Sequence, residues 1–195
     1  MDGSVRCIFP GLGPVAGYAA TATIRASDTA EGGATANQLW EHVRDVPGPR
    51  VVVVQDLDNP PGIGSLWGEV NSNVFRALGA VGTVTNGCVR DLQEMEALGF
   101  HAFAGCVGVS HAYVHVLDVG IPVDVGGLTV RPGDLLHADR HGVLNVPLEV
   151  APELAEAIRQ VEVSEREIID LCQSPEFSVD ALAAAFRRKA ETESH

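Results

Sequence analysis

The spacing of apolar residues alternates between helical and strand patterns along the whole chain. Helical spacing predicts five helices, over residues 34–46, 67–78, 90–98, 152–172 and 178–189. In the second of these, the apolar positions are Trp67, Val70, Val74, Phe75 and Leu78. The fourth carries a stripe formed by Leu154, Ile158, Val161, Ile168 and Cys172.

Strand patterns fill most of the remaining sequence. Two strands are expected within residues 4–26, on either side of a turn at Gly11–Pro14. Residues 50–57 contain four successive valines, which is typical of a strand buried on both faces. Further strands are expected at 81–87 and 100–109, and several short ones follow between 113 and 147. This order predicts an α/β fold with a β-rich second half, in which residues 100–147 pack with the central helices around one core.

Length and composition favour one domain covering residues 1–195, with a disordered tail at 190–195. A chain of 195 residues with 46% hydrophobic residues is long enough to bury a substantial core. The net charge is −13 and the only basic run is Arg187–Lys189, so direct nucleic-acid binding is not expected. Four scattered cysteines, no signal peptide and no membrane-spanning stretch predict a cytoplasmic protein with reduced thiols.

The segment from Gly64 to Gly99 is the candidate site, because it is predicted to form a helix, a strand and a second helix. In such a unit the first turns of both helices lie near the same end of the sheet. Residues 68–71 and the pair Arg90–Asp91 are therefore expected to face one cleft.

These residue types suit an anionic oxo-acid held beside a divalent cation. The start of a helix offers unpaired backbone N–H groups to a carboxylate, and Arg90 can bind the same anion through two parallel hydrogen bonds. Asp91 supplies an oxygen ligand for a hard cation, and Glu69 can reach that ion directly or through water. The alternative is structural, since an Arg-Asp pair at a helix start can be only a cap and a surface ion pair.

Three pieces of sequence together resemble the RraA-like family, which includes the 4-hydroxy-4-methyl-2-oxoglutarate aldolases. They are Gly68-Glu69 followed by a helix, the stretch NGCVRDLQE, and the segment from Pro122 to Pro147. The most specific piece is the Arg-Asp-x-x-acidic signature formed by Arg90, Asp91 and Glu94. The resemblance implies a layered α/β sandwich similar to the swivelling phosphohistidine domains.

The resemblance also implies a function, namely metal-dependent cleavage of 4-hydroxy-2-oxo acids to pyruvate, with decarboxylation of oxaloacetate. It implies that substrate lies on Arg90 and on backbone N–H groups of Gly68, Glu69, Val70 and Asn71. Asp91 would bind Mg²⁺ or Mn²⁺, and Glu69 would orient water, so that Arg90, Asp91 and Glu69 are the predicted catalytic residues.

The same resemblance places the site at the interface of a homotrimer or hexamer. An acidic residue from a neighbouring C-terminal helix would complete the metal shell there, with Glu165 and Glu167 as candidates. The rival function is that of a non-catalytic regulator that binds a ribonuclease or a helicase, because some family members restrain a ribonuclease.

Other candidate residues carry weaker signals. Asp56 and Asp58 lie in a Pro- and Gly-rich loop, where the turn-forming role is favoured over a place near the metal. His111 and His115 have the spacing of metal ligands on a helix, but their segment is predicted as strand or loop, which favours ordinary packing. Cys88 is expected to be a small buried hydrophobic residue.

Overall fold

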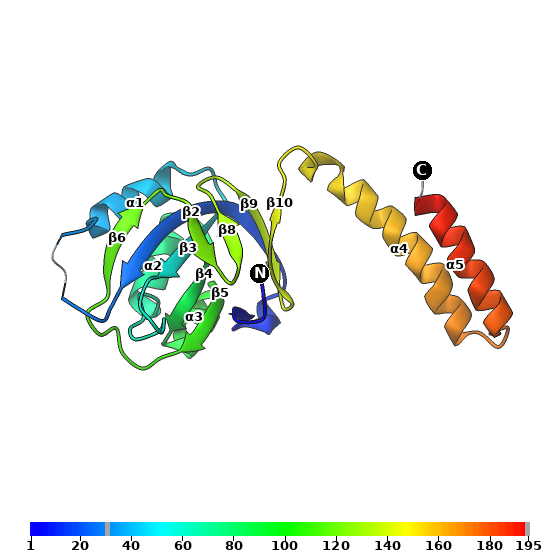
Figure 1. Ribbon diagram of the computed structural model, residues 1–195, viewed down its shortest axis with the longest axis horizontal. Coiled ribbons are helices and arrows are strands. Elements are labelled where there is room, and N and C mark those ends of the chain that lie inside the picture. The colour runs from blue at the N-terminus through cyan, green and yellow to red at the C-terminus, as the bar shows by residue number, and fades with distance from the viewer. Residues whose placement is uncertain (30–31, 194–195) are drawn as a thin grey trace. The chain divides into compact units, whose positions relative to one another are not determined.

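The computed structural model describes residues 1–29 and 32–193, which separate into two compact units, 1–147 and 148–195 (Figure 1). The N-terminal unit contains β1 (Arg6–Cys7), η1 (Pro10–Leu12), β2 (Val15–Arg25), α1 (Ala36–Asp45), β3 (Arg50–Asp56), α2 (Glu69–Ala77), β4 (Ala80–Val89), α3 (Leu92–Leu98), β5 (His101–Val107), β6 (His115–Val119), β7 (Val123–Val125), β8 (Leu128–Val130), β9 (Leu135–Asp139) and β10 (Gly142–Val146). The C-terminal unit contains α4 (Ala151–Gln173) and α5 (Val179–Glu193). All five predicted helices are present.

The main sheet of the N-terminal unit has eight strands in the order β1-β5-β4-β3-β2-β9-β10, with β6 also paired to β2. Strands β2, β3, β4 and β5 run parallel, while β1, β6 and β9 join them in antiparallel pairs. Strand β2 is 11 residues long, so its first part pairs with β9 and its last part with β6. The predicted α/β fold with a β-rich second half is confirmed.

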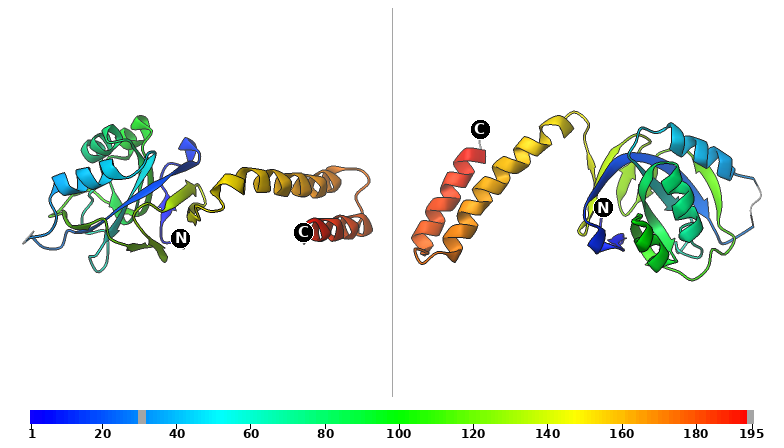
Figure 2. Two further views of the ribbon diagram at one scale, coloured as in Figure 1. Left: turned by 90° about the horizontal axis from the view of Figure 1, so that it is seen from above. Right: turned by 180° about the vertical axis from the view of Figure 1, so that it is seen from behind.

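Helices α1, α2 and α3 cover one face of this sheet, as the left view of Figure 2 shows. The hairpin β7–β8 packs against the opposite face, through Val123, Val125 and Val130. The four valines of β3 alternate accordingly, with Val52 and Val54 on the helical side and Val51 and Val53 on the hairpin side. The prediction of one core is therefore wrong, because a sheet buried on both faces separates two hydrophobic clusters.

Helix α2 begins two residues later than its apolar pattern predicts, and this changes which side chains it buries. Trp67 is fully buried but precedes the helix, whereas Ser72 and Phe75 are the residues that α2 buries. Val70, assigned to the apolar stripe, is 69% exposed. Because Trp67 lies in the loop before α2, the apolar face predicted from it differs from the face that the helix buries.

The C-terminal unit is a helical hairpin. No side chain of α4 is buried within the chain, and its apolar residues Leu154, Ile158, Val161, Val163 and Ile169 are all exposed. Helix α5 extends four residues beyond its predicted end at Lys189, and the rest of the predicted disordered tail, residues 194–195, lies outside the described residues. The prediction of a single domain over 1–195 stays a prediction.

Candidate functional site

The structure brings the start of α2 and the end of β4 together. A parallel bridge joins Trp67 to Val89, and the Arg90 N–H donates to the Trp67 carbonyl oxygen over 3.1 Å. The Ser65 hydroxyl lies 2.6 Å from the Trp67 carbonyl oxygen and 2.7 Å from that of Cys88. These backbone links place Gly68 beside Arg90 and Asp91, as the sequence predicts.

Gly68 lies in close contact with the Arg-Asp pair. A Cβ atom at this position would lie 2.6 Å from Asp91 Oδ2 and 2.9 Å from Arg90 Cζ. Its φ of −172° is extended backbone that any residue adopts, so the requirement for glycine is one of space. The backbone at Gly68 therefore lies so close to the Arg90 guanidinium and the Asp91 carboxylate that no side chain fits between them.

Asp91 has a left-handed backbone conformation, with φ 53° and ψ 50°. It is the N-cap residue of α3 by position, yet its side chain makes no cap hydrogen bond to that helix. Instead, Asp91 Oδ2 accepts a 3.0 Å hydrogen bond from the Glu69 N–H and a 2.5 Å ion-pair hydrogen bond from Arg90 Nη1. This conformation, which costs a non-glycine residue about 1–2 kcal/mol, turns the carboxylate toward the start of α2.

The structural alternative, a helix cap and an ion pair, is therefore present in part. Asp91 pairs with Arg90, but it caps α2 and not the expected helix α3. The side chains of Arg90 and Asp91 are 28% and 31% exposed. Asp91 Oδ1 forms no hydrogen bond among the described residues, and the buried Nε of Arg90 has no partner there either. Asp91 Oδ1 and Arg90 Nη2 therefore remain available for a ligand, whereas the buried Arg90 Nε does not.

The first turn of α2 offers further donors. Glu69 N–H is used by Asp91, while the N–H groups of Val70 and Asn71 form no backbone hydrogen bond in the described structure. The Asn71 side chain points elsewhere, because its Nδ2 donates to the Leu66 carbonyl oxygen over 2.6 Å. An anion beside Arg90 would meet free N–H groups at the positive end of the helix dipole.

A divalent cation fits this donor set only in part. The Asp91 carboxylate is a hard oxygen ligand with one unbonded oxygen, and the exposed Glu69 carboxylate lies on the adjoining turn. Among residues 1–29 and 32–193, no group of three or more His, Cys, Asp or Glu side chains is placed to hold a metal ion. One or two carboxylates are enough for a cation that keeps water and binds its substrate directly, as Mg²⁺ does.

The remaining candidate residues have structural roles in this unit. Asp56 accepts hydrogen bonds from the N–H groups of Asp58 and Gly62, and Asp58 accepts from Ala26 and Ser27. The favoured turn-forming role is confirmed for Asp56, whereas Asp58 connects the loop to the end of β2, about 30 residues away in the sequence. Burial raises the pKa of the Asp56 carboxyl, and the two N–H donors oppose that effect.

The histidines and the signature glutamate do not converge on the pair. His111 Nδ1 lies 2.7 Å from the Ala112 carbonyl oxygen, and His115 Nδ1 lies 2.8 Å from that of Tyr113. Their segment is loop and strand, so the packing role is favoured over metal binding. Glu94 is exposed in the first turn of α3, where its charge complements the helix dipole.

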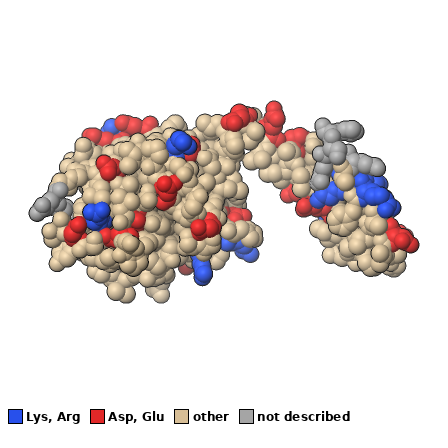
Figure 3. Space-filling view, viewed as in Figure 1, with Lys and Arg blue, Asp and Glu red and all other residues tan. Residues whose placement is uncertain are grey.

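Charged side chains are dispersed on the face of the N-terminal unit drawn in Figure 3, where Lys and Arg occur singly among the acidic residues. That face carries no basic patch of the kind that nucleic-acid binding needs. None of the helices that the structure describes combines the length and apolarity required to cross a membrane. The expected cytoplasmic location stays a prediction.

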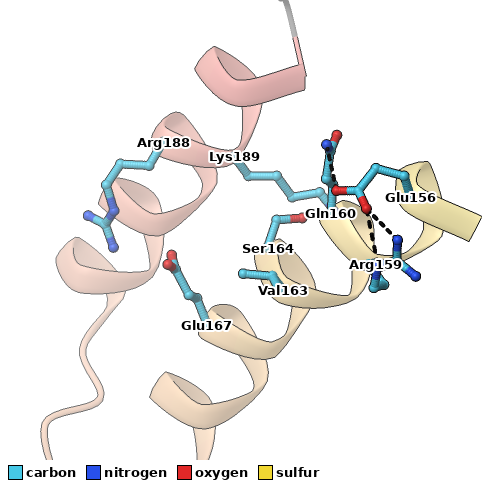
Figure 4. Close-up of a pocket in the computed structure, with 8 residues that line it drawn as sticks. All are labelled: Glu156, Arg159, Gln160, Val163, Ser164, Glu167, Arg188 and Lys189. Carbon is cyan, nitrogen blue, oxygen red and sulfur yellow. Dashed lines mark hydrogen bonds and ion pairs between the residues drawn. The ribbon is translucent and has the colours of Figure 1, made fainter.

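The two acidic candidates of the C-terminal unit differ in their surroundings. Glu165 forms a 3.5 Å ion pair with Lys189. Glu167 lines a pocket of about 360 Å³ between α4 and α5 and points into it beside Arg188 (Figure 4). Which of them completes a neighbouring site stays open, and the assignments of Gly68, Glu69, Val70, Asn71, Arg90 and Asp91 to substrate and metal stay predictions.

The sequence did not indicate the residues that build the site without contacting a ligand. Ser65 connects the loop to β4, and the buried Trp67 and Ser72 each leave a polar atom, Nε1 and Oγ, without a partner in the described structure. The sequence shows only a Ser-x-Trp-Gly pattern before a predicted helix, and this pattern is not specific for any function. Their roles depend on a contact between α2 and β4 that the sequence order does not show.

Comparison with known proteins identifies the relatives of this chain. The family model described as RraA-like, Aldolase/RraA, matches residues 2–145. The chain is 31% identical over 106 residues to "Uncharacterized protein MJ0644" of Methanocaldococcus jannaschii, covering 53% of this chain and 50% of that protein. It is 32% identical over 121 residues to "Putative 4-hydroxy-4-methyl-2-oxoglutarate aldolase" of Ectopseudomonas mendocina, covering 57% and 68%.

A solved structure supports the fold. RraAS2 of Streptomyces coelicolor, described as an unusual member of the RNase ES inhibitor RraA protein family, superposes with a TM-score of 0.65 at 24% identity, over 83% of this chain and 79% of that one. At this identity the likeness concerns the fold alone. The chain spans half or less of the length of the first curated relatives it matches.

Proposed function

The chain belongs to the RraA-like family, and from this premise we propose that it is a divalent-metal-dependent lyase that cleaves 4-hydroxy-2-oxo acids to pyruvate and decarboxylates oxaloacetate. The observation that carries the proposal is the Asp91 carboxylate, which is turned by a left-handed backbone away from its own helix and toward the start of α2. A carboxylate that only capped α3 would not need this conformation. The relative from Ectopseudomonas mendocina carries the name of a putative aldolase, which supports a lyase activity.

Substrate binding falls to Arg90 and α2. The Arg90 guanidinium uses Nη1 on Asp91, and Nη2, which forms no hydrogen bond among the described residues, would bind a substrate carboxylate. The free N–H groups of Val70 and Asn71 add donors in the first turn of α2. Together they would hold the 2-oxo acid in one orientation, which is a large part of the catalytic effect of such clamps.

Asp91, with Glu69 beside it, would hold Mg²⁺ or Mn²⁺. When bound, that ion supplies Lewis-acid stabilisation of the negative charge that develops on the 2-oxo oxygen during C–C cleavage. Glu69 is exposed at the first position of α2, where its carboxylate can accept a proton from water next to the substrate hydroxyl. Gly68 keeps the space in which these groups meet.

The experiment is steady-state kinetics of pyruvate release from oxaloacetate and from 4-hydroxy-4-methyl-2-oxoglutarate, across a titration of Mg²⁺ and Mn²⁺. Arg90→Lys should raise KM and lower kcat, because the charge remains but the planar fork is lost. Asp91→Asn should lower turnover at low metal and recover in part with excess Mn²⁺. Glu69→Gln should lower kcat more than it changes metal affinity.

Each variant is checked by thermal melting, and a chelator should abolish the wild-type activity. Activity near the wild-type level in both Arg90→Lys and Asp91→Asn would refute the site. Equal loss of folding in the two variants would instead favour the structural role of the pair.

The second candidate function is a non-catalytic regulator that binds a ribonuclease or a helicase. The Streptomyces structure, described as that of an unusual member of the RNase ES inhibitor RraA protein family, motivates it. Under this alternative, the purified protein would release no pyruvate from either substrate at any metal concentration, and substitution of Arg90 would leave partner binding unchanged.

A further inference from the structure

Two cysteines lie opposite each other at the end of the parallel strands β4 and β5. Thr85 pairs with Ala104 and Cys88 pairs with Cys106, so β4 advances three residues while β5 advances two. This bulge carries Asn86, whose side chain exchanges hydrogen bonds with the backbone of Asp56 over 2.7 and 2.9 Å. Without the extra residue, Cys106 would lie opposite a glycine.

The register brings the two sulfur atoms within reach of one bond. Paired residues of neighbouring strands lie about 4.8 Å apart, inside the range of about 4.4–6.8 Å between Cα atoms joined by a disulfide. Both sulfurs also lie over the same glycine, because a Cβ atom at Gly62 would be 2.5 Å from Cys106 Sγ and 4.0 Å from Cys88 Sγ. Neither cysteine is in a disulfide in the reduced chain.

We propose that Cys88 and Cys106 are a redox modification site, which a two-electron oxidant such as hydrogen peroxide converts into a reversible disulfide. The proposal goes beyond the proposed lyase activity, and its readout does not depend on that activity. The two remaining cysteines, Cys7 and Cys172, belong to β1 and α4 and serve as internal controls.

Exposure sets the order of the chemistry. Cys106 is half-buried, whereas Cys88 is 3% exposed and donates a hydrogen bond from Sγ to the Gly62 carbonyl oxygen over 3.3 Å. Burial, followed by the neighbouring Cys106 thiol, raises the pKa of Cys88 to about 12. Cys106 is therefore the thiol that meets the oxidant first, and Cys88 is the resolving thiol.

The reaction balances with peroxide as the oxidant. The Cys106 sulfur attacks one peroxide oxygen, the O–O bond breaks, and a sulfenic acid and one water result. The Cys88 sulfur then attacks the sulfenic sulfur, so that the S–S bond forms, the S–O bond breaks, and a second water leaves with the Cys88 proton. The two thiols lose two electrons and peroxide gains them, and an external dithiol reverses the change.

Oxidation would remove a contact of the loop that leads to the candidate site. The Cys88 thiol is the donor to Gly62, so a disulfide leaves that carbonyl oxygen without it. Gly62 lies on the same loop as Ser65, whose hydroxyl contacts the Cys88 carbonyl oxygen. Cys88 is thus linked by two hydrogen bonds, to Gly62 and to Ser65, to the loop that leads into α2.

The test is intact mass and thiol counting on the 195-residue chain. Reduced protein is treated with hydrogen peroxide, unfolded, and alkylated with iodoacetamide. We expect the four alkylatable thiols to fall to two, the mass before alkylation to drop by two hydrogen atoms, and dithiothreitol to restore all four. Peptide mapping should find a fragment in which Cys88 and Cys106 are joined.

Two variants test the assignment to Cys88 and Cys106. Cys7→Ser with Cys172→Ser should still lose both remaining thiols, whereas Cys106→Ser should form no intramolecular disulfide. Stable sulfinic acid on Cys106 with Cys88 still alkylatable would overturn the proposal, as would unchanged thiols or a bond to Cys7 or Cys172. Should Cys106→Ser fail to fold, the mapping of the wild-type protein decides alone.

Discussion

At the scale of single residues, the site depends on how closely backbone can approach side chain. Gly68 leaves room for the Arg90 guanidinium and the Asp91 carboxylate, and Asp91 adopts a left-handed conformation in order to face α2. Ordinary side-chain chemistry, an arginine and two carboxylates, becomes a candidate site only through these two backbone features. The first of these, the space at Gly68, can be tested without removing a functional group.

The substitution Gly68→Ala should reduce activity without unfolding the protein. The new methyl group would lie 2.6 Å from Asp91 Oδ2 and 2.9 Å from Arg90 Cζ, so both groups must move by a fraction of an ångström or more. A misplacement of that order can cost about a hundredfold in rate. We expect kcat/KM for oxaloacetate to fall by at least about tenfold, with a change in melting temperature of only a few degrees.

The matched control is Gly11→Ala. A Cβ atom at Gly11 would meet no atom within 4 Å, and its φ is not positive. It should keep both activity and stability. Wild-type kinetics in Gly68→Ala would show that the pair is not the reacting site.

His42 predicts a pH dependence of stability. Its Nε2 accepts a 3.2 Å hydrogen bond from the Thr21 N–H, which requires the neutral ring. Burial lowers the pKa of His42, and the nearby Asp45 opposes this effect. The folded state therefore binds a proton at His42 less readily than the unfolded state does. The stabilisation contributed by neutral His42 is fully present above the unfolded pKa of about 6.5 and is lost as the pH falls toward the lower folded pKa.

We expect the free energy of unfolding, measured by urea titration, to decrease between pH 7.5 and pH 5 more steeply in the wild type than in His42→Gln. Burial also lowers the pKa of His101, so the difference between the two proteins, rather than either curve, reports on His42. Parallel curves for the two proteins would contradict the assignment.

At the scale of elements, one arginine holds the ends of two helices on the sheet. Arg50 begins β3, and its guanidinium donates to the carbonyl oxygens of Arg44, Val46 and Leu78 over 2.9, 2.6 and 2.9 Å. The first two lie at the C-terminal end of α1 and the third at that of α2. A single planar group thus satisfies carbonyls that helix ends leave unpaired.

Arg50→Met should destabilise the protein by about 1–3 kcal/mol, because three hydrogen bonds are lost and partly buried carbonyls keep no donor. Thermal and urea unfolding measure the effect. Arg140→Met is the matched control, since Arg140 is exposed and its side chain forms no hydrogen bond or ion pair within residues 1–29 and 32–193. Equal stability of the two variants would show that the hydrogen bonds of Arg50 to the ends of α1 and α2 do not stabilise the fold.

At the scale of the whole molecule, the exposed apolar face of α4 predicts self-association. Leu154, Ile158, Val161 and Ile169 are between 39% and 48% exposed, on a helix that buries no side chain within the chain. An amphipathic helix of 23 residues needs a partner surface for this stripe. We expect a homotrimer or hexamer by light scattering at micromolar concentration.

Ile158→Glu should shift the protein toward the monomer, while Glu162→Gln, on the same helix, should not. A monomeric wild type would contradict the expectation. Persistence of the oligomer in Ile158→Glu would place the interface elsewhere.

Several features were determined by the sequence by itself. The four valines of β3 fixed a strand buried on both faces, and the helical spacing of the C-terminal residues fixed α4 and α5, because such patterns depend on local periodicity. The Arg90–Asp91 pair and the Gly68–Asn71 turn could also be identified from residue type and spacing. The resemblance to the RraA-like family rested on the same residues, and the family match confirms it.

Only the tertiary structure decided how those parts meet. The predicted stripe on α2 included Val70, which is exposed, because the start of the helix depends on the contact between Trp67 and Val89. Likewise, Asp91 caps α2 rather than α3, and Cys88 faces Cys106 through a bulge held by Asp56. Periodicity reports which face of an element is apolar, whereas the register between elements is set by contacts between residues distant in the sequence.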